Sequence, residues 1–173
     1  MRTILIVGVA LAAAGCAKVA GNAANAPATN AVAVQPDYHP SLGDLMTMAV
    51  QPRHIKLGVA GKARNWDYAA YETSELKSAF ARVQRTIPTY RKTDLKPLID
   101  GSVKEPIDAL DAAVKAKDAA GFDAAYADLT KACNTCHQQL DHTFVVIKAP
   151  DASPYADQVL TGAAGGSKKA KAK

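Results

Sequence analysis

Aromatic residues are scarce in this chain of 173 residues, at 6% of the total, although 49% of the residues are hydrophobic. Alanine supplies much of that hydrophobicity, which favours helices and disfavours a β-sandwich or β-barrel rich in valine and tyrosine. The first run that could compete as a strand is 144–147, and prolines 150 and 154 limit its extent. We therefore expect an all-α fold, in a chain whose length suits one domain.

The chain also lacks the residue patterns of common enzyme classes: we find no Ser–His–Asp set, HExxH motif, phosphate-binding loop or paired carboxylates. We therefore do not expect an enzyme. The formal net charge is +5, but six of the 21 cationic residues lie at the two ends, which leaves 15 cations against 16 acids in residues 19–167. A body with a net charge of −1 does not indicate a nucleic-acid partner.

The apolar run at the N-terminus is short and indicates export. Residues 3–15 follow Arg2 and end in small residues, a pattern too short for a membrane span and typical of a signal peptide, which we assign to residues 1–16. Residues 11–16 resemble a bacterial lipobox, which implies that Cys16 is lipidated and anchors the protein to the outer membrane. The alternative is cleavage near residues 14–20 and a free periplasmic protein.

The composition divides the mature chain into three parts. Residues 17–37 are rich in alanine, asparagine and proline and are predicted to be a flexible linker, and residues 161–173 are predicted to be a disordered basic tail. The folded domain is therefore expected at 38–160, with an irregular segment at 145–160 along its outside.

Within 38–160, apolar residues recur at spacings of three and four in four segments. Ser41 begins the first segment and Gly61 ends it, Asn65 caps the second and Pro88 ends it, and the capping box 102–105 begins the third. The predicted core positions are Leu45, Met48, Pro52, Ile55 and Val59; Trp66, Ala69, Thr73, Leu76, Phe80, Val83 and Ile87; Val103, Ile107, Leu110 and Val114; and Phe122, Tyr126, Leu129, Cys133, Cys136 and Leu140.

Four amphipathic helices with short connections favour an antiparallel four-helix bundle, and spacings of three and four favour crossing angles of about 20°. Pro52 lies inside the first helix and is expected to kink it, because it cannot donate to the carbonyl of Met48.

Residues 133–137 read Cys-Asn-Thr-Cys-His, the CxxCH attachment signature for c-type haem. Residues three apart share a helix face, so the sulfurs of Cys133 and Cys136 can reach both vinyl groups of one porphyrin, and His137 can ligate the iron. Zinc is disfavoured because one helix cannot easily surround a tetrahedral ion, and a thioredoxin-like pair because no strand precedes it. We therefore expect one covalent haem c, held on the core stripe of the last helix.

With CxxCH near the end of the fourth helix, residues 40–142 resemble the class II cytochrome c family (cytochrome c′-type). The resemblance implies a four-helix bundle in which the sixth side of the iron faces the first helix, and a homodimer. Low-spin members place a methionine there. Five-coordinate members commonly carry a tyrosine and a basic residue three and four positions after the histidine; here these positions are Leu140 and Asp141, which favours the low-spin type.

Met48 is the predicted sixth ligand, because it lies on the core stripe, whereas Met46 is rotated from it by about 200° in an α-helix. Met46 and His54 are the alternatives, and Arg53 or Lys56 could pair with a haem propionate. The expected function is one-electron transfer with periplasmic redox partner proteins, through a His/Met-ligated low-spin haem. The alternatives are a five-coordinate haem protein that binds NO or CO, and a non-haem helical lipoprotein.

Overall fold

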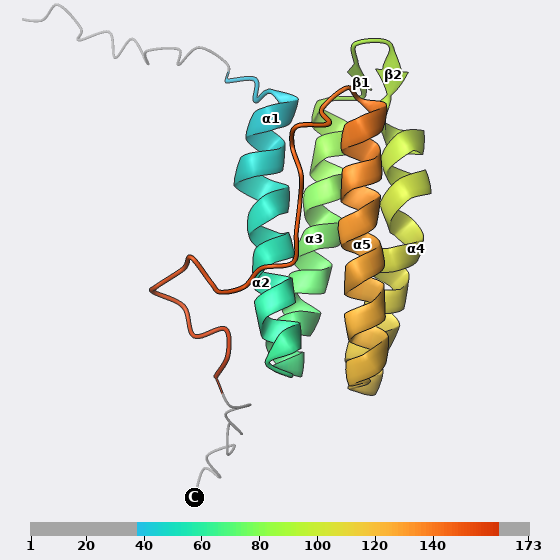
Figure 1. The fold of residues 1–173 in the computed structure, drawn as a ribbon. Coiled ribbons are helices and arrows are strands. Elements are labelled where there is room, and N and C mark those ends of the chain that lie inside the picture. Colours follow the sequence, from blue (N-terminus) through green and yellow to red (C-terminus); the bar gives the residue numbers. More distant parts are fainter. Residues whose placement is uncertain (1–37, 163–173) are drawn as a thin grey trace, which may run out of the picture. The chain divides into compact units, whose positions relative to one another are not determined.

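The computed structural model describes residues 38–162, and these residues are mainly helical (Figure 1). The helical elements are α1 (Leu42–Leu45), the π-helical turn η1 (Met46–Val50), α2 (Gln51–Lys62), α3 (Trp66–Thr86), α4 (Leu95–Ala116) and α5 (Ala119–Gln139). The strands β1 (Thr89–Tyr90) and β2 (Thr93–Asp94) pair as an antiparallel hairpin between α3 and α4. The predicted signal peptide 1–16 with Cys16, the linker 17–37 and most of the tail 161–173 lie outside the described residues.

The long helices lie side by side and share one hydrophobic core. The α1–η1–α2 segment packs against α3, α3 against α4, and α4 against α5, while α2 also contacts α5 (Figure 1). The predicted stripes of α3, α4 and α5 supply many of the most deeply buried side chains, which include Leu76, Val83, Leu110, Phe122 and Leu129. The sequence prediction of a helical protein with these core positions is therefore confirmed for the last three stripes.

The first helical segment begins as predicted. Ser41 accepts a hydrogen bond from the backbone of Asp44 (3.1 Å) and donates its own backbone N–H to the Asp44 carboxylate (2.9 Å), which forms a capping box. Ahead of Pro52 the helix widens into the π turn η1, which the sequence did not predict and in which the N–H of Gln51 bonds to the carbonyl of Met46 five residues back.

The predicted start of the third helix is wrong. α4 begins at Leu95, directly after the hairpin, where the Leu95 N–H bonds to the carbonyl of Pro88 (2.9 Å). Ser102 lies inside the helix and donates its hydroxyl to the carbonyl of Leu98 (2.8 Å), a bond that a serine in a helix interior can make without capping anything. The buried Leu95 and Ile99 extend the core stripe toward the N-terminus of α4.

Residues 143–162, which we call the strap, follow α5 without regular secondary structure and run back along α2 and α5 (Figure 1). The Asn65 side chain, whose carbonyl caps α3, donates to the carbonyl of Leu160 (3.1 Å), and Leu160 is only 2% exposed. The strap is therefore part of the packed structure and lies along the helices as expected. Among residues 38–162, no helix is long and apolar enough to cross a bilayer.

Candidate functional site: the CxxCH helix

The CxxCH motif occupies the last turns of α5, on the face that packs inward. Leu129 is fully buried on this face, and Cys133 and Cys136 continue it as partly buried residues in contact with the core. Neither thiol is in a disulfide. Burial raises the pKa of both thiols, to about 12 for Cys133. The structure thus brings both predicted haem-attachment residues to one side of one helix as neutral thiols.

The imidazole of His137 is oriented by the strap. Its Nδ1 lies 2.8 Å from the backbone carbonyl of Val145, and a carbonyl oxygen can only accept, so Nδ1 carries the hydrogen and donates it. The neutral ring then has its lone pair on Nε2. A histidine that ligates a metal through one nitrogen and donates the other N–H to a carbonyl is the usual arrangement in metalloproteins.

Two glycines of α2 allow close packing against α5, on the N-terminal side of the CxxCH motif. A Cβ on Gly61 would overlap the ring of Phe122, and one on Gly58 would overlap the Tyr126 hydroxyl and lie 2.9 Å from Pro150. One turn further, the His54 ring meets Tyr126 and Thr130. Along this antiparallel pair, each step of three or four residues back along α2 matches a step of about four residues forward along α5. Continuing the same register predicts that η1 is level with residues 133–137, and η1 itself packs mainly against α3.

Met48, the predicted sixth ligand, does not occupy the core. Its side chain is 70% exposed, whereas Ala49 and Val50 are buried and Met46 is partly buried against the core. The prediction of a core position assumed 100° per residue from Leu45, and the wider π turn changes that rotation. The core placement of Met48 is therefore wrong, and Met46 is the methionine of η1 that packs inward.

His54, the other ligand alternative, is buried between α2 and α5 and is 4% exposed. Its Nδ1 lies 3.1 Å from the Tyr126 hydroxyl and its Nε2 lies 3.0 Å from the Thr130 hydroxyl. Burial lowers the pKa of His54 to about 4, so the ring is neutral near pH 7. Both ring nitrogens therefore have partners within the protein.

The hydrogens of this group can be counted. The Tyr126 hydroxyl also donates to the backbone carbonyl of His54 (2.8 Å), and the Thr130 hydroxyl to the carbonyl of Tyr126 (2.9 Å). When both hydroxyl hydrogens are donated to these carbonyls, neither hydroxyl can donate to the imidazole, so a hydrogen for each of the two ring contacts would have to come from His54. A neutral imidazole has only one N–H, so it can donate to the Tyr126 hydroxyl or to the Thr130 hydroxyl, but not to both. Sequence reasoning missed this network. The spacing of Tyr126 and Thr130, four apart on one helix face, was the only signal of it.

The cations considered for a propionate have partners on other elements. Arg53 contacts the carboxylates of Glu72 (3.3 Å) and Glu75 (3.2 Å) on α3, and the Glu72 side chain is fully buried. Lys56 lies 4.6 Å above the ring of Tyr155 in the strap. Arg53 therefore compensates a buried carboxylate, a role that the sequence did not indicate.

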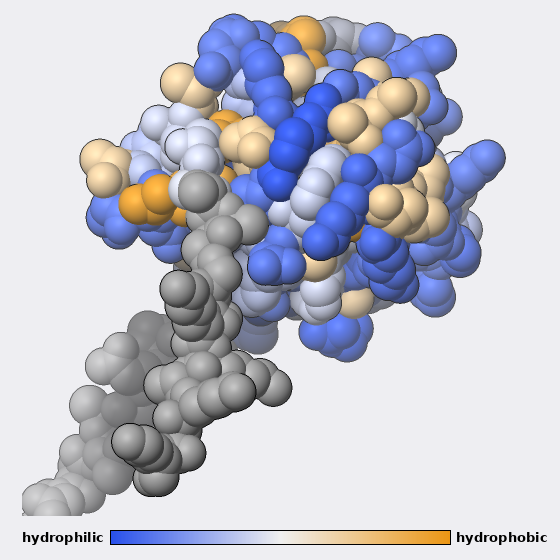
Figure 2. All heavy atoms as spheres, turned by 90° about the horizontal axis from the view of Figure 1, so that it is seen from below, coloured by the Kyte–Doolittle hydropathy of each residue, from blue (hydrophilic) through white to orange (hydrophobic). Residues whose placement is uncertain are grey.

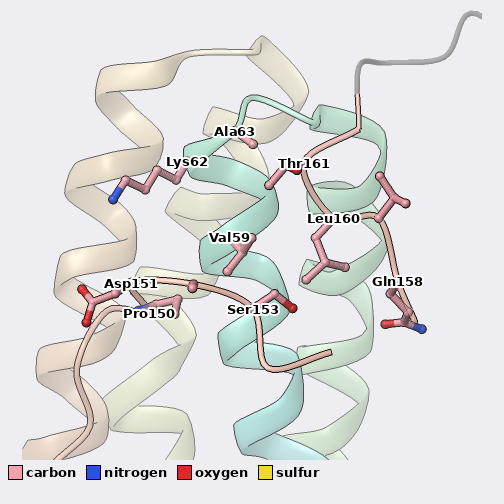
Figure 3. A pocket seen from close by; sticks show the side chains of 11 residues that line it. Val59, Lys62, Ala63, Pro150, Asp151, Ser153, Gln158, Leu160 and Thr161 are labelled. Atoms are coloured by element: carbon pink, nitrogen blue, oxygen red, sulfur yellow. The ribbon is translucent and has the colours of Figure 1, made fainter. Parts of the chain in front are cut away.

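A shallow hollow of about 560 Å³ lies away from the cysteines, between the end of α2 and the strap (Figure 3). Val59, Lys62, Pro150, Asp151 and Leu160 are among its lining residues. Seen from this end, the surface is mostly hydrophilic, with hydrophobic side chains in several separate places (Figure 2). Within residues 38–162, no group of three or more histidine, cysteine, aspartate or glutamate side chains is arranged to hold a metal ion.

Comparison of the chain with protein-family models, with curated proteins and with solved structures gives no match.

Proposed function

We propose that this chain is a c-type cytochrome: an antiparallel four-helix bundle that carries one covalent haem c and transfers single electrons. The observation that carries the proposal is the CxxCH motif on the inward face of α5, with the Nδ1–H of His137 donated to the carbonyl of Val145 at 2.8 Å. The resemblance of residues 40–142 to the class II cytochrome c family supports it.

The residues at the end of α5 fit such a group. Cys133 and Cys136 are free thiols one helical turn apart, as two thioether bonds to one porphyrin require. His137 offers its Nε2 lone pair. A bound haem supplies a one-electron iron couple, and the apolar side chains of the core around the cysteines would lower the local dielectric and limit access of water.

We propose Met46, in place of Met48, as the sixth ligand. Met46 belongs to η1, its side chain packs against the core, and the α2–α5 register, continued beyond His54, predicts η1 at the level of residues 133–137. His54 is the weaker candidate, because each of its ring nitrogens already lies within 3.1 Å of a side-chain hydroxyl oxygen. A methionine ligand raises the reduction potential of haem iron, which suits electron transfer at the potentials of periplasmic partners.

A five-coordinate haem that binds NO or CO is the second candidate. The observation that favours it is the exposure of Met48, which leaves Met46 as the one methionine of η1 that packs inward. In that case Met46 would fill space beside the iron without ligating it, and the sixth position would stay open for a small ligand.

Absorption spectra of the full chain, produced with periplasmic haem attachment, test the proposal. We expect intact mass to show a covalent haem that Cys133→Ala/Cys136→Ala loses. The oxidised protein should show the weak long-wavelength band of a sulfur–iron bond, which Met46→Ala abolishes and the matched control Met48→Ala retains. A high-spin reduced spectrum with rapid CO binding in the unmodified protein would select the second candidate, and an unchanged mass would select a non-haem helical lipoprotein.

The proposed site of action is the periplasm, with redox partner proteins there. The mass of the mature N-terminus distinguishes a lipidated Cys16, and hence outer-membrane anchoring, from cleavage near residues 14–20. The homodimer implied by the resemblance is tested by light scattering.

A further inference from the structure

One of the two variable residues of the CxxCH motif binds the strap. The Asn134 side chain accepts a hydrogen bond from the N–H of Ile147 (2.7 Å) and donates one to the carbonyl of Ile147 (2.9 Å). Both ends of the amide are thus used on one backbone residue, much as a neighbouring β-strand would pair with it. The pair of bonds fixes the position of Ile147 relative to α5.

Val145, two residues before Ile147 in the strap, contacts His137, the proposed proximal haem ligand. The carbonyl of Val145 accepts the hydrogen bond from Nδ1 of His137, and Asn134 and His137 are three residues apart, on one face of α5. Only Val146 lies between the two bonded strap residues. Asn134, His137, Val145 and Ile147 therefore form a closed ring of contacts, in which displacement of Ile147 would also displace the carbonyl that orients His137.

The strap needs this contact, because its first residues have little burial of their own. Phe144 and Val146 are 79% and 72% exposed, and Val145 is 39% exposed. Beyond Ile147 the strap is held by other contacts, among them Pro150 close to Gly58 and Lys56 above Tyr155. Asn134 thus makes two of the side-chain hydrogen bonds that hold the start of the strap on α5, beside the one from His137 to Val145.

We propose that Asn134 is a positioning residue for the proximal histidine: it holds the strap so that the Val145 carbonyl fixes the His137 ring with Nε2 free to ligate. The inference rests on the proposed haem function and deepens it. It gives the strap, which lies outside the class II pattern, a role at the iron site, because a carbonyl partner for Nδ1–H makes a ligating imidazole a stronger electron donor.

The other variable residue supplies a matched control. Thr135 is exposed and donates its hydroxyl to the carbonyl of Lys131 within α5 (3.1 Å), away from the strap contacts. Asn134→Ala removes both bonds to Ile147, whereas Asn134→Asp keeps an acceptor for the Ile147 N–H and loses the donor. Ile147→Pro removes the N–H from the strap side and leaves the attachment motif unchanged.

The test measures two quantities on each full-length holoprotein: hydrogen exchange of the strap amides 144–149, and the reduction potential. For Asn134→Ala and Ile147→Pro we expect at least tenfold faster exchange and a higher potential, because His137 loses its fixed carbonyl partner. Asn134→Asp should be intermediate, and Thr135→Ala should change neither quantity.

Faster exchange with an unchanged potential would overturn the positioning role and leave a purely structural clamp. Unchanged exchange would overturn the clamp itself. If the unmodified protein carries no covalent haem by mass, the proposed function fails and the positioning role fails with it. Exchange of the strap amides still distinguishes that result, because it reports the Asn134–Ile147 contact without any haem.

Discussion

Acid should destabilise this protein through His54 in a defined pH window. In the unfolded chain the imidazole titrates near its ordinary pKa of 6.5, whereas burial lowers its pKa in the folded protein to about 4. Between these values the unfolded chain binds more protons, so the free energy of unfolding falls as the pH falls. The separation of the two pKa values corresponds to a loss of about 3 kcal/mol in the free energy of unfolding. This free energy falls by at most about 1.4 kcal/mol for each pH unit.

The groups around His54 allow this contribution to be isolated. Burial raises the pKa of Tyr126, which stays neutral throughout the window. Glu72 on α3 has the opposite effect on the pH dependence of stability. Burial raises the pKa of its carboxyl, although the Arg53 guanidinium opposes this shift, so protonation of Glu72 favours the folded state. This contribution is common to the unmodified protein and a His54→Gln variant, and it cancels in their difference.

The assay is urea unfolding, followed by far-ultraviolet circular dichroism, at a series of pH values from 7.5 to 4 for both proteins. We expect the unmodified protein to lose about 3 kcal/mol more than His54→Gln between pH 7 and pH 4. Two parallel curves of unfolding free energy against pH would refute the assignment of His54 as a buried neutral imidazole.

Two further predictions concern packing and charge. Gly61→Ala should destabilise the protein by about 1–3 kcal/mol, because the added methyl overlaps the Phe122 ring; Gly101→Ala adds the same methyl to open space inside α4 and should stabilise by up to about 1 kcal/mol. Urea midpoints in the reverse order would contradict the α2–α5 packing. Arg53→Leu should lower the free energy of unfolding by about 3 kcal/mol, because it leaves the Glu72 carboxylate buried without its cation. Adding Glu72→Leu should restore most of that stability. Additive losses of stability in this double-mutant cycle would argue against the Arg53–Glu72 ion pair.

The helical fold was largely predictable, since burial of one face of each helix governs both the sequence pattern and the packing. The stripe through Leu129, Cys133 and Cys136 follows α-helical spacing without interruption, so its inward face was correctly predicted. Met48 was misplaced because a local change in hydrogen bonding altered the rotation per residue, and residue type does not record that change.

Other features depend on contacts between distant parts of the chain. A serine followed by a glutamate three residues later, as at Ser102, has the same sequence pattern at a helix start and inside a helix. The roles of Asn134 and Arg53 depend on partners 13 and 19 residues away. No local periodicity encodes such pairs, and the strap itself has no regular pattern from which its path could be read.

The π turn has a consequence for changes in chain length. In an α-helix, removing one residue rotates everything before it by about 100°. Deletion of one residue within Met46–Val50 would instead convert the wide π turn to an ordinary α turn, whose four residues turn the chain nearly as far as the five of the π turn. Leu42 and Leu45, now buried, would therefore keep facing the core. The first two turns of this helix can thus lose one residue at Met46–Val50 and keep their angular phase, whereas the same deletion within α2 would rotate them by about 100° away from the core.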